Sequence, residues 1–554
     1  MRCLNVNPAF SSLFPTLQAR SSTPATHYLL LPPPYSLLPT FTGALERASH
    51  ALLPTFSSLL STFTGALKRA SHALPSTFSS LLSTFTGALK RASHALPSTF
   101  SSLLSTFTGA LKRASHALPS PPSSLLSTML YTSLGGETLS IQSDQLLDLL
   151  RETIEKSGKT PRRMLLLPPD HTRLNSQAGL ITQLLWKEYS TRCHIDIMPA
   201  LGTHKPMNDA QLEMMFGTEI PKGAFLVHDW RNDVRTMGEV PSEKIQELSG
   251  GRLDYTVQVQ ANNILFQGYD LILSIGQVVP HEVVGMANYT KNIMVGVGGS
   301  DMINKSHFLG AVSNMEKIMG RADSPVRRLF NYGVDTYLSD LPIVYMLTVM
   351  ARDEATGRMA MRGFYSGTGG DAYLEACKLC VATNLVLLDK PLKKVVVFLD
   401  PDEFHTTWLG NKAIYRTRMA IADDGDLIIL APGLKEFGED SAMDRLIRKY
   451  GYNGTPATLK AVRENADMQE NLGGAAHLIH GSSEGRFNIT YCPGPEVSRE
   501  EIEGVGFKYG DLEAMTAKYN PERLKDGMNL VDGEEVFYVS NPALGLWALK
   551  ENFE

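Results

Sequence analysis

Three residues with reactive side chains stand in one stretch of the chain, between Pro280 and Phe308. They are His281, Lys291 and His307; the lysine follows the first histidine by ten residues, and the second histidine follows the lysine by sixteen. An imidazole, with a pKa near about 6.5, can take up and return a proton at neutral pH, and it can also bind a metal ion. A lysine amine that has lost its proton is a nucleophile. This stretch therefore combines the parts of an acid–base site with those of a covalent or metal site.

Two shorter polar segments precede this stretch. One reads Asp170-His171-Thr172-Arg173, and the other reads Gly202-Thr203-His204-Lys205-Pro206. The planar guanidinium of Arg173 can hold a carboxylate with two parallel hydrogen bonds. His204 supplies a second imidazole for proton transfer. A small carboxylic acid whose carbon or oxygen exchanges a proton is the kind of substrate that these side chains favour.

The order and spacing of the three segments resemble the nickel-dependent lactate racemase family. That family has a D-x-T-R loop, then a G-T-H-[RK]-P segment, and then a histidine, a lysine and a histidine as found here. The resemblance covers residues 137–320 and is weaker in the second half of the chain. It implies an isomerase, namely a racemase or epimerase that inverts C2 of a 2-hydroxy acid.

The resemblance also implies a cofactor. It is a nickel-pincer nucleotide, a pyridinium-derived mononucleotide that carries nickel and is attached to a lysine, which matches Lys291 here. His307 matches the histidine that completes the nickel coordination, and a square-planar set of soft ligands suits this metal. Asp170 and Thr172 could bind the nucleotide or orient a neighbouring side chain. The proteins that make the cofactor are then expected partners.

His204 and His281 match the acid–base pair of the family, and Arg173 matches its carboxylate-binding arginine. Direct proton abstraction from C2 is difficult, because that hydrogen is weakly acidic beside an ionised carboxylate. Hydride removal from carbon with proton removal from oxygen gives a planar 2-keto acid instead, and hydride return to the other face inverts the centre. No G-x-G-x-x-G segment after a strand provides a conventional dinucleotide site.

The second half of the chain departs from the family at the substrate. Lactate racemases place a glutamine there, followed three residues later by a lysine. Lys412 could be that lysine, but Leu409 stands where the glutamine is expected, beside Trp408. A longer sugar acid, an aldonate, is therefore favoured over lactate. Its hydroxyl groups could reach Lys412, Arg486, Ser482 or Ser483.

Two other functions use the same residues. A zinc-dependent hydrolase or lyase could employ His204, His281 and His307 as ligands, although no carboxylate stands at ligand spacing and Lys291 would then have no role. A non-catalytic nickel- or nucleotide-binding module could also retain the fold. Such a module would need only some of these side chains.

The segments with reactive residues each follow an apolar run that reads as a buried strand. These runs are MLLLPP before Asp170, HIDIMPAL before Gly202 and DLILSIGQVV before His281. Strands that alternate with helical patterns predict an α/β fold with a mostly parallel sheet, in which such loops meet at one edge. We expect two α/β lobes over residues 137–325 and 340–554, with the active site in the cleft between them.

A low-complexity leader is expected over residues 1–136. A 22-residue unit recurs in it, with GALxRASHA beginning at Gly43, Gly65, Gly87 and Gly109. The leader has nine basic residues and one acidic residue, a net charge of +8, which leaves −13 for the rest. Basic amphipathic repeats of this kind resemble an organellar transit peptide, and a disordered or spurious leader fits the composition equally well.

The remaining composition excludes several classes of protein. A mildly acidic body gives no reason to expect a nucleic acid as partner, and no apolar run reaches the roughly 18 residues that span a membrane. Five cysteines in 554 residues are too few for a disulfide framework, which favours a soluble protein of a reducing compartment, cytoplasmic or organellar and not secreted. The pair Cys377 and Cys380 lies in a helical pattern and is expected to pack as small apolar residues.

Overall fold

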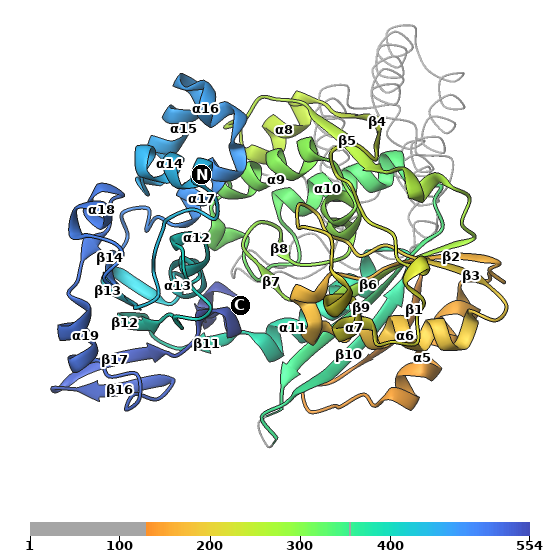
Figure 1. The fold of residues 1–554 in the computed structure, drawn as a ribbon, viewed down its shortest axis with the longest axis horizontal. Helices are drawn as coiled ribbons and strands as arrows, with labels where there is room; N and C mark the ends of the chain where they lie inside the picture. Colours follow the sequence, from red (N-terminus) through yellow and green to blue (C-terminus); the bar gives the residue numbers. More distant parts are fainter. Residues whose placement is uncertain (1–128, 354–355, 554) are drawn as a thin grey trace, which may run out of the picture. The chain divides into compact units, whose positions relative to one another are not determined.

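The structure is a computed structural model that describes residues 129–353 and 356–553 (Figure 1). The chain divides into two compact units, residues 1–125 and 126–554. The repeats of the expected leader lie outside the described residues. The second unit contains two six-stranded sheets with helices packed on them, so the chain has the expected α/β fold.

The first sheet has the strand order β1-β10-β9-β6-β2-β3. The four strands from β9 to β3 run parallel to their neighbours, and β10 and β1 add an antiparallel edge. The predicted mostly parallel sheet is thereby confirmed. In sequence order the strands are β1 (Leu130–Gly135), β2 (Arg163–Leu167), β3 (His194–Ile197), β6 (Leu271–Gln277), β9 (Ile343–Arg352) and β10 (Met359–Gly367).

Helices cover both faces of this sheet because its strands are apolar on both sides. Along β2, Met164 and Leu166 belong to one core cluster, whereas Leu165 and Leu167 belong to another. Since successive side chains of a strand point to opposite faces, each cluster marks one face. Helices α5 (Ser143–Lys156), α6 (Ala178–Tyr189) and α7 (Asp209–Phe216) pack on the first face, and α8 (Ser242–Ser249), α9 (Ser300–Val312), α10 (Pro325–Tyr337) and α11 (Gly370–Asn384) on the second.

The second sheet has the order β15-β14-β13-β12-β17-β16, parallel except for the β16–β17 edge pair. Its strands are β12 (Leu392–Phe398), β13 (Ile421–Ala431), β14 (Asn488–Pro493), β15 (Lys508–Tyr509), β16 (Gly527–Val531) and β17 (Glu534–Val539). Its helices are α12 (Thr407–Gly410), α13 (Lys412–Thr417), α14 (Ser441–Tyr450), α15 (Gly454–Glu464), α16 (Ala466–Glu470), α17 (Leu472–His480), α18 (Arg499–Gly504) and α19 (Leu512–Lys518).

Three small two-stranded sheets complete the fold. They pair β4 (Val234–Val240) with β5 (Val257–Asn262), β7 (Pro280–His281) with β8 (Gly285–Met286), and β11 (Val386–Leu388) with β18 (Trp547–Leu549). The β7–β8 hairpin carries one of the candidate catalytic histidines and matters most for the site.

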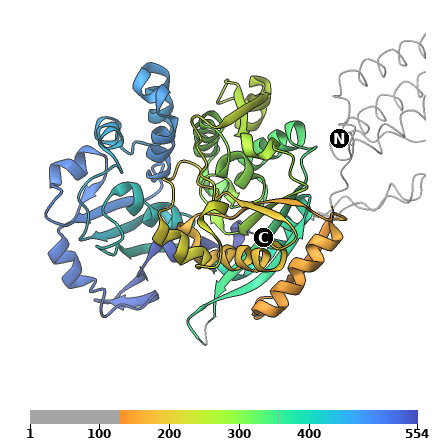
Figure 2. The ribbon, with the colours of Figure 1, turned by 45° about the vertical axis from the view of Figure 1, so that its right-hand side comes forward.

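The two sheets belong to lobes that share one hydrophobic core. The cluster on the second face of the first sheet continues from Ile272 and Phe308 to Val395 and Ile429 of the second sheet. Helix α9 of the first lobe packs against α17 of the second, and Figures 1 and 2 show these helices where the green and blue parts of the ribbon meet. The lobes are therefore joined by packed side chains as well as by the chain.

Two segments belong to a different part of the fold from the one that the sequence predicted. Residues 130–135, assigned to the leader, form β1, because Tyr131 and Thr132 are buried where the strand pairs with β10. Residues 343–367, assigned to the second lobe, form β9 and β10 of the first sheet. Local sequence does not report which sheet an apolar strand joins, since that is decided by non-local pairing.

The apolar run AFLVHD, residues 224–229, has the composition of a strand. It contributes only a single bridge, between Phe225 and Ile197. Among the helices that the structure describes, none is long and apolar enough to cross a membrane.

Candidate active site

The segments that contain Asp170, His204 and His281 follow β2, β3 and β6, respectively. They therefore lie at the carboxyl ends of neighbouring parallel strands. After β2 the chain goes to β3 on one side, whereas β6 pairs with β2 on the other side. The loops therefore leave the sheet in opposite directions beside β2, which is the position where open α/β sheets bind ligands. The predicted meeting of the segments at one edge of the sheet agrees with this topology.

Asp170 and His204 form a hydrogen-bonded pair across two of these loops. The Nδ1 atom of His204 lies 2.6 Å from Oδ2 of Asp170, and Thr172 donates its hydroxyl and its backbone N–H to Oδ1. Burial would raise the pKa of Asp170, but the hydrogen bonds from His204 and Thr172 outweigh burial and lower it. In the neutral form of His204, the ionised carboxylate holds the ring proton on Nδ1, so that Nε2 carries the lone pair.

His281 lies on the β7–β8 hairpin with its imidazole largely enclosed; its side chain is 13% exposed. Its Nδ1 accepts a hydrogen bond from the backbone N–H of Val283 at 3.1 Å. Burial moves the pKa of His281 well below its usual value, so the ring is neutral at pH 7. A neutral ring that accepts at Nδ1 carries its proton on Nε2.

As neutral rings, His204 and His281 are thus held in opposite tautomers. The first offers a lone pair at Nε2, and the second offers a proton. An acid and a base are what a reaction needs when one proton leaves a substrate and one returns. The difference between the two rings comes from two contacts, of His204 with the Asp170 side chain and of His281 with the Val283 backbone. The sequence alone did not reveal either contact.

Lys291 comes directly before a π-helical turn, Asn292–Gly296. The side-chain amide of Asn292 donates to the carbonyl oxygen of Leu167 and to the hydroxyl of Ser274, at 3.0 and 2.9 Å, which ties the turn to the end of β2 and the middle of β6. The N–H of Gly202 donates to the carbonyl oxygen of Gly296 at 2.9 Å, which ties it to the loop of His204. Turns of this rare kind often occur at functional sites.

Burial lowers the pKa of Lys291 to about 8, and the nearby guanidinium of Arg173 adds to this effect. No residue that the structure describes accepts a hydrogen bond from its amine. A large fraction of Lys291 is therefore neutral near pH 8, as an amine needs to be in order to form an amide-type bond.

His307 lies on α9 with a fixed ring orientation. Its Nδ1–H donates to the carbonyl oxygen of Ile303, one helical turn earlier, at 2.6 Å. Burial lowers the pKa of His307, so Nε2 carries a lone pair and no proton. A metal-binding histidine commonly has its second nitrogen bonded to a carbonyl in this way.

The second lobe contributes positive groups to the site from α13. Lys412 and Arg416 both lie on this helix, and the guanidinium of Arg416 reaches the carbonyl oxygen of Pro280 at 3.5 Å. Burial lowers the pKa of Lys412. Contact with the hairpin of His281 brings α13 to the candidate site.

The geometry can now be compared with known proteins. Residues 142–320 match the lactate racemase N-terminal domain. This part of the chain is a lactate racemase N-terminal domain. No curated protein matches the chain. The matched region contains all three segments that carry the resemblance, from Asp170 to His307.

Two solved structures are similar to this chain in fold. A protein from Thermotoga maritima is 23% identical, and the match covers 75% of this chain and 100% of that one with a TM-score of 0.62. The lactate racemase apoprotein from Thermoanaerobacterium thermosaccharolyticum is 15% identical, with 78% and 96% covered and a TM-score of 0.55. Both matches extend beyond the N-terminal domain.

Two residues of the D-x-T-R loop are open to solvent. Thr172 and Arg173 lie in the short 3-10 helix His171–Ser176 and are exposed. Arg173 is close enough to His281, Lys291 and Lys412 to affect their charge states. Of the two roles left open for Asp170 and Thr172, orientation of a neighbouring side chain is the one that these contacts support.

Glu282 is a residue that the sequence reasoning missed. It follows His281 directly, and its Oε2 lies 3.8 Å from Nδ1 of that ring. Burial would raise the pKa of the Glu282 carboxyl, but the neighbouring His281 and Arg416 lower it. A carboxylate directly after the second histidine was a visible signal, but only the fold brings Arg416 to it.

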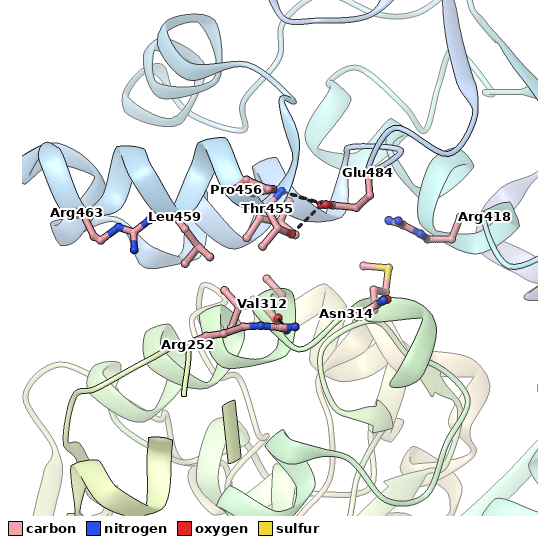
Figure 3. Close-up of a pocket in the computed structure, with 12 residues that line it drawn as sticks. Arg252, Val312, Asn314, Arg418, Thr455, Pro456, Leu459, Arg463 and Glu484 are labelled. Atoms are coloured by element: carbon pink, nitrogen blue, oxygen red, sulfur yellow. Dashed lines mark hydrogen bonds between the residues drawn. The ribbon is translucent and has the colours of Figure 1, made fainter. Parts of the chain in front are cut away.

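The loop that follows α17 does not place Arg486 at the site. Arg486 binds Glu316 and Asp423 through ion pairs at 2.7 and 2.8 Å, and Ser482 is buried and hydrogen-bonded to Glu484. Figure 3 shows Glu484 and Arg418 beside a cavity of 490 Å³ whose walls are α15 and the end of α9. A second cavity, of 390 Å³, is lined by Ser482 and Ser483. None of the candidate catalytic residues lines either cavity.

Two further histidines and the Cys377–Cys380 pair have structural roles. His228 is buried between the carbonyl oxygen of Gly298 and the amide of Asn262. His477 bonds the hydroxyl of Tyr452 and stacks on Trp408. Cys377 and Cys380 are buried in the core.

Within the described part of the chain, no three His, Cys, Asp or Glu side chains lie close enough to hold a metal ion by themselves. His204, His281 and His307 therefore do not form the three-ligand site that the zinc alternative requires. A single histidine that completes an otherwise non-protein ligand set remains compatible with this geometry.

Proposed function

We propose that the protein is a racemase or epimerase that inverts C2 of a 2-hydroxy acid, with an aldonate favoured over lactate. Family membership supports the coarser part of this proposal. The observation that carries it is the pair of histidines with complementary tautomers, together with a buried amine of lowered pKa near His281. A non-catalytic binding module would have no use for opposite tautomers.

The residues fit the nickel-pincer nucleotide expected of this family. Lys291 is a buried amine with no described hydrogen-bond acceptor, and its pKa of about 8 suits covalent attachment. The Nε2 atom of His307 has a lone pair that could bind nickel, because Nδ1 of the same ring is bonded to the carbonyl oxygen of Ile303. When bound, the group supplies a hydride acceptor that can return the hydride to either face of the carbon.

The protein residues then handle the substrate and its protons. His204 takes the hydroxyl proton of one isomer through Nε2, and His281 gives a proton back from the opposite side; the roles exchange for the other isomer. Asp170 stabilises the imidazolium that forms on His204. Arg173 holds the substrate carboxylate, and Lys412 supplies a second positive group from the other lobe.

The test is to produce the protein together with the cofactor-making enzymes. We expect stoichiometric nickel and a mass increment on the peptide that contains Lys291, and neither in Lys291→Arg, which keeps the charge. Each pure isomer of a 2-hydroxy acid is then incubated with the loaded enzyme, and its C2 epimer is followed by NMR. Retention of the C2 hydrogen in heavy water supports hydride return, whereas deuterium uptake contradicts it.

The same preparation tests the zinc alternative. A protein that holds zinc, carries an unmodified Lys291 and hydrolyses an ester or amide would contradict the proposal. Failure to convert any hydroxy acid despite bound nickel would favour the binding module.

A further inference from the structure

Three polar side chains that the proposed chemistry does not use lie around the hairpin of His281. Glu282 is on the hairpin itself, Arg416 on α13 reaches the hairpin backbone at Pro280, and His480 ends α17. Both His480 and Arg416 are close enough to Glu282 to affect its charge state, which places the three residues near one another. They come from both lobes and meet on the second-lobe side of the catalytic histidine.

Two of these groups are buried and lack partners. Among the described residues, Nε of Arg416 and Nε2 of His480 have no hydrogen-bond partner, although His480 is only 6% exposed. The carboxylate of Glu282 interacts with its own backbone N–H, and its nearest described ion-pair partner is Nδ1 of His281, at 3.8 Å. Most buried polar atoms in proteins are paired, so two unpaired ones near the His281 hairpin indicate a ligand that pairs them.

The chemistry of the three groups defines what they would bind. A carboxylate accepts hydrogen bonds, the Nε–H of an arginine donates one, and a neutral imidazole nitrogen can do either. A sugar hydroxyl both donates and accepts, so it can satisfy a carboxylate and a guanidinium in the same place. The methyl group of lactate can satisfy none of them.

Resting on the proposed function, we infer that Glu282, Arg416 and His480 form a subsite for the hydroxyl groups of an aldonate beyond C2. The subsite lies on the side of His281 that faces α13. A second carboxylate, as in a dicarboxylic hydroxy acid, fits it less well, because Glu282 would repel that group while Arg416 attracted it. The subsite then favours longer polyhydroxylated acids, because a shorter acid leaves the polar groups of the subsite without hydrogen-bond partners.

The experiment uses the full-length, cofactor-loaded enzyme with a six-carbon aldonate, a four-carbon aldonate, lactate and malate as separate substrates. The Glu282→Gln variant keeps the shape of the side chain, but it removes the negative charge and makes the side chain a weaker hydrogen-bond acceptor. We expect it to raise KM for the aldonates by about tenfold or more, as the loss of a buried hydroxyl contact does, and to change KM for lactate less than twofold. A fall in kcat alone, equal for all substrates, would show that Glu282 only supports His281 and would overturn the subsite.

Two further variants keep the inference testable if Glu282→Gln does not fold. Arg416→Lys and His480→Gln should each show the same selective rise in KM. Glu484→Gln is the matched control, since Glu484 lines the separate cavity of Figure 3, and it should leave the substrate preference unchanged.

The outcomes separate the subsite from the proposed function. Epimerisation of aldonates with the same preference in all three variants overturns the subsite and leaves the function standing. Faster turnover of malate than of every aldonate also overturns it. Failure of the wild type to convert any hydroxy acid overturns the function, and the subsite with it.

Discussion

The Nδ1 atom of His204 and the Oδ2 atom of Asp170 are 2.6 Å apart, although 34 residues separate them in the chain. The aspartate is 3% exposed, whereas the histidine side chain is 57% exposed. The buried carboxylate therefore fixes a ring whose other face is open to a ligand. This arrangement makes Asp170 a positioning residue for His204, and it leads to the first prediction.

Asp170→Asn should reduce turnover by about the 10² to 10⁴ that a general base contributes, because an asparagine can donate to Nδ1 and shift the proton of His204 to Nε2. His204→Ala should cost a similar factor, and the double variant little more than either single one. The measurement is kcat on the best aldonate. Losses that multiply in the double variant would show that the two residues act independently.

Cofactor attachment should depend on pH through Lys291. Its pKa is lowered to about 8, so the amine is charged below this value and neutral above it. The rate at which Lys291 is acylated by a small activated ester should rise up to about pH 8 and then level off, whereas an ordinary lysine keeps gaining until about pH 10.4. Peptide mass spectrometry after short labelling at several pH values measures both. A rate that still rises steeply between pH 9 and 10 would contradict the lowered pKa.

His307→Ala should weaken nickel retention without unfolding the protein. Among the described residues, the ring bonds only the carbonyl oxygen of Ile303, which lies in a helix and keeps its backbone partners. His194→Ala is the matched control, because His194 is exposed and bonds Asp196 on β3, away from the site. Metal analysis after dialysis should find nickel in the control and loss in His307→Ala. Equal retention would remove His307 from the metal site.

The hairpin of His281 should not tolerate a side chain at Gly285. This glycine has φ +90°, and a Cβ atom there would lie 2.2 Å from the carbonyl oxygen of Arg321. We expect Gly285→Ala to lose on the order of 1–3 kcal/mol of stability and to reduce activity as His281 shifts. Thermal unfolding and kcat together measure this.

Gly223→Ala is the control, since no atom lies within 4 Å of a Cβ at that position. It should change the melting temperature very little. A normal melting temperature for Gly285→Ala would mean that the hairpin can adjust.

Removal of residues 1–128 should leave a folded enzyme, because the second compact unit begins at Leu126 and β1 at Leu130. Removal of residues 1–136 should be worse, since it also deletes β1 and exposes the edge of β10. Thermal unfolding and size-exclusion chromatography of the two truncated proteins make the comparison. Equal stability would show that β1 contributes little.

The sequence was most informative where chemistry follows a buried strand. Parallel strands that are covered on both faces read as continuous apolar runs, so the loops with Asp170, His204 and His281 could be placed at one edge of the sheet. Glu282 escaped notice because an acidic residue in a loop is usually solvated. Its meaning depends on Arg416, which is 134 residues away in the chain.

The same physics explains the error in the strand assignment. Residues 343–352 are as apolar as any strand of the second sheet, and nothing local tells which sheet they join. The protonation states at His204 and His281 were equally hidden. They depend on single hydrogen bonds, whose donors and acceptors are set by backbone geometry that side-chain types do not encode.

The π-helical turn after Lys291 has a consequence for insertions and deletions. Such a turn holds more residues than an α-helical turn, and each residue of an α-helix advances by about 100° around the axis. Loss of one residue from Asn292–Gly296 would restore α-helical hydrogen bonds and would rotate Lys291 by about that angle relative to the anchor at Gly202. The amine would then point away from the loop of His204. A deletion that makes the backbone more regular would therefore inactivate the site. We expect substitution of an apolar side chain in this turn to be tolerated better than a change in the number of its residues.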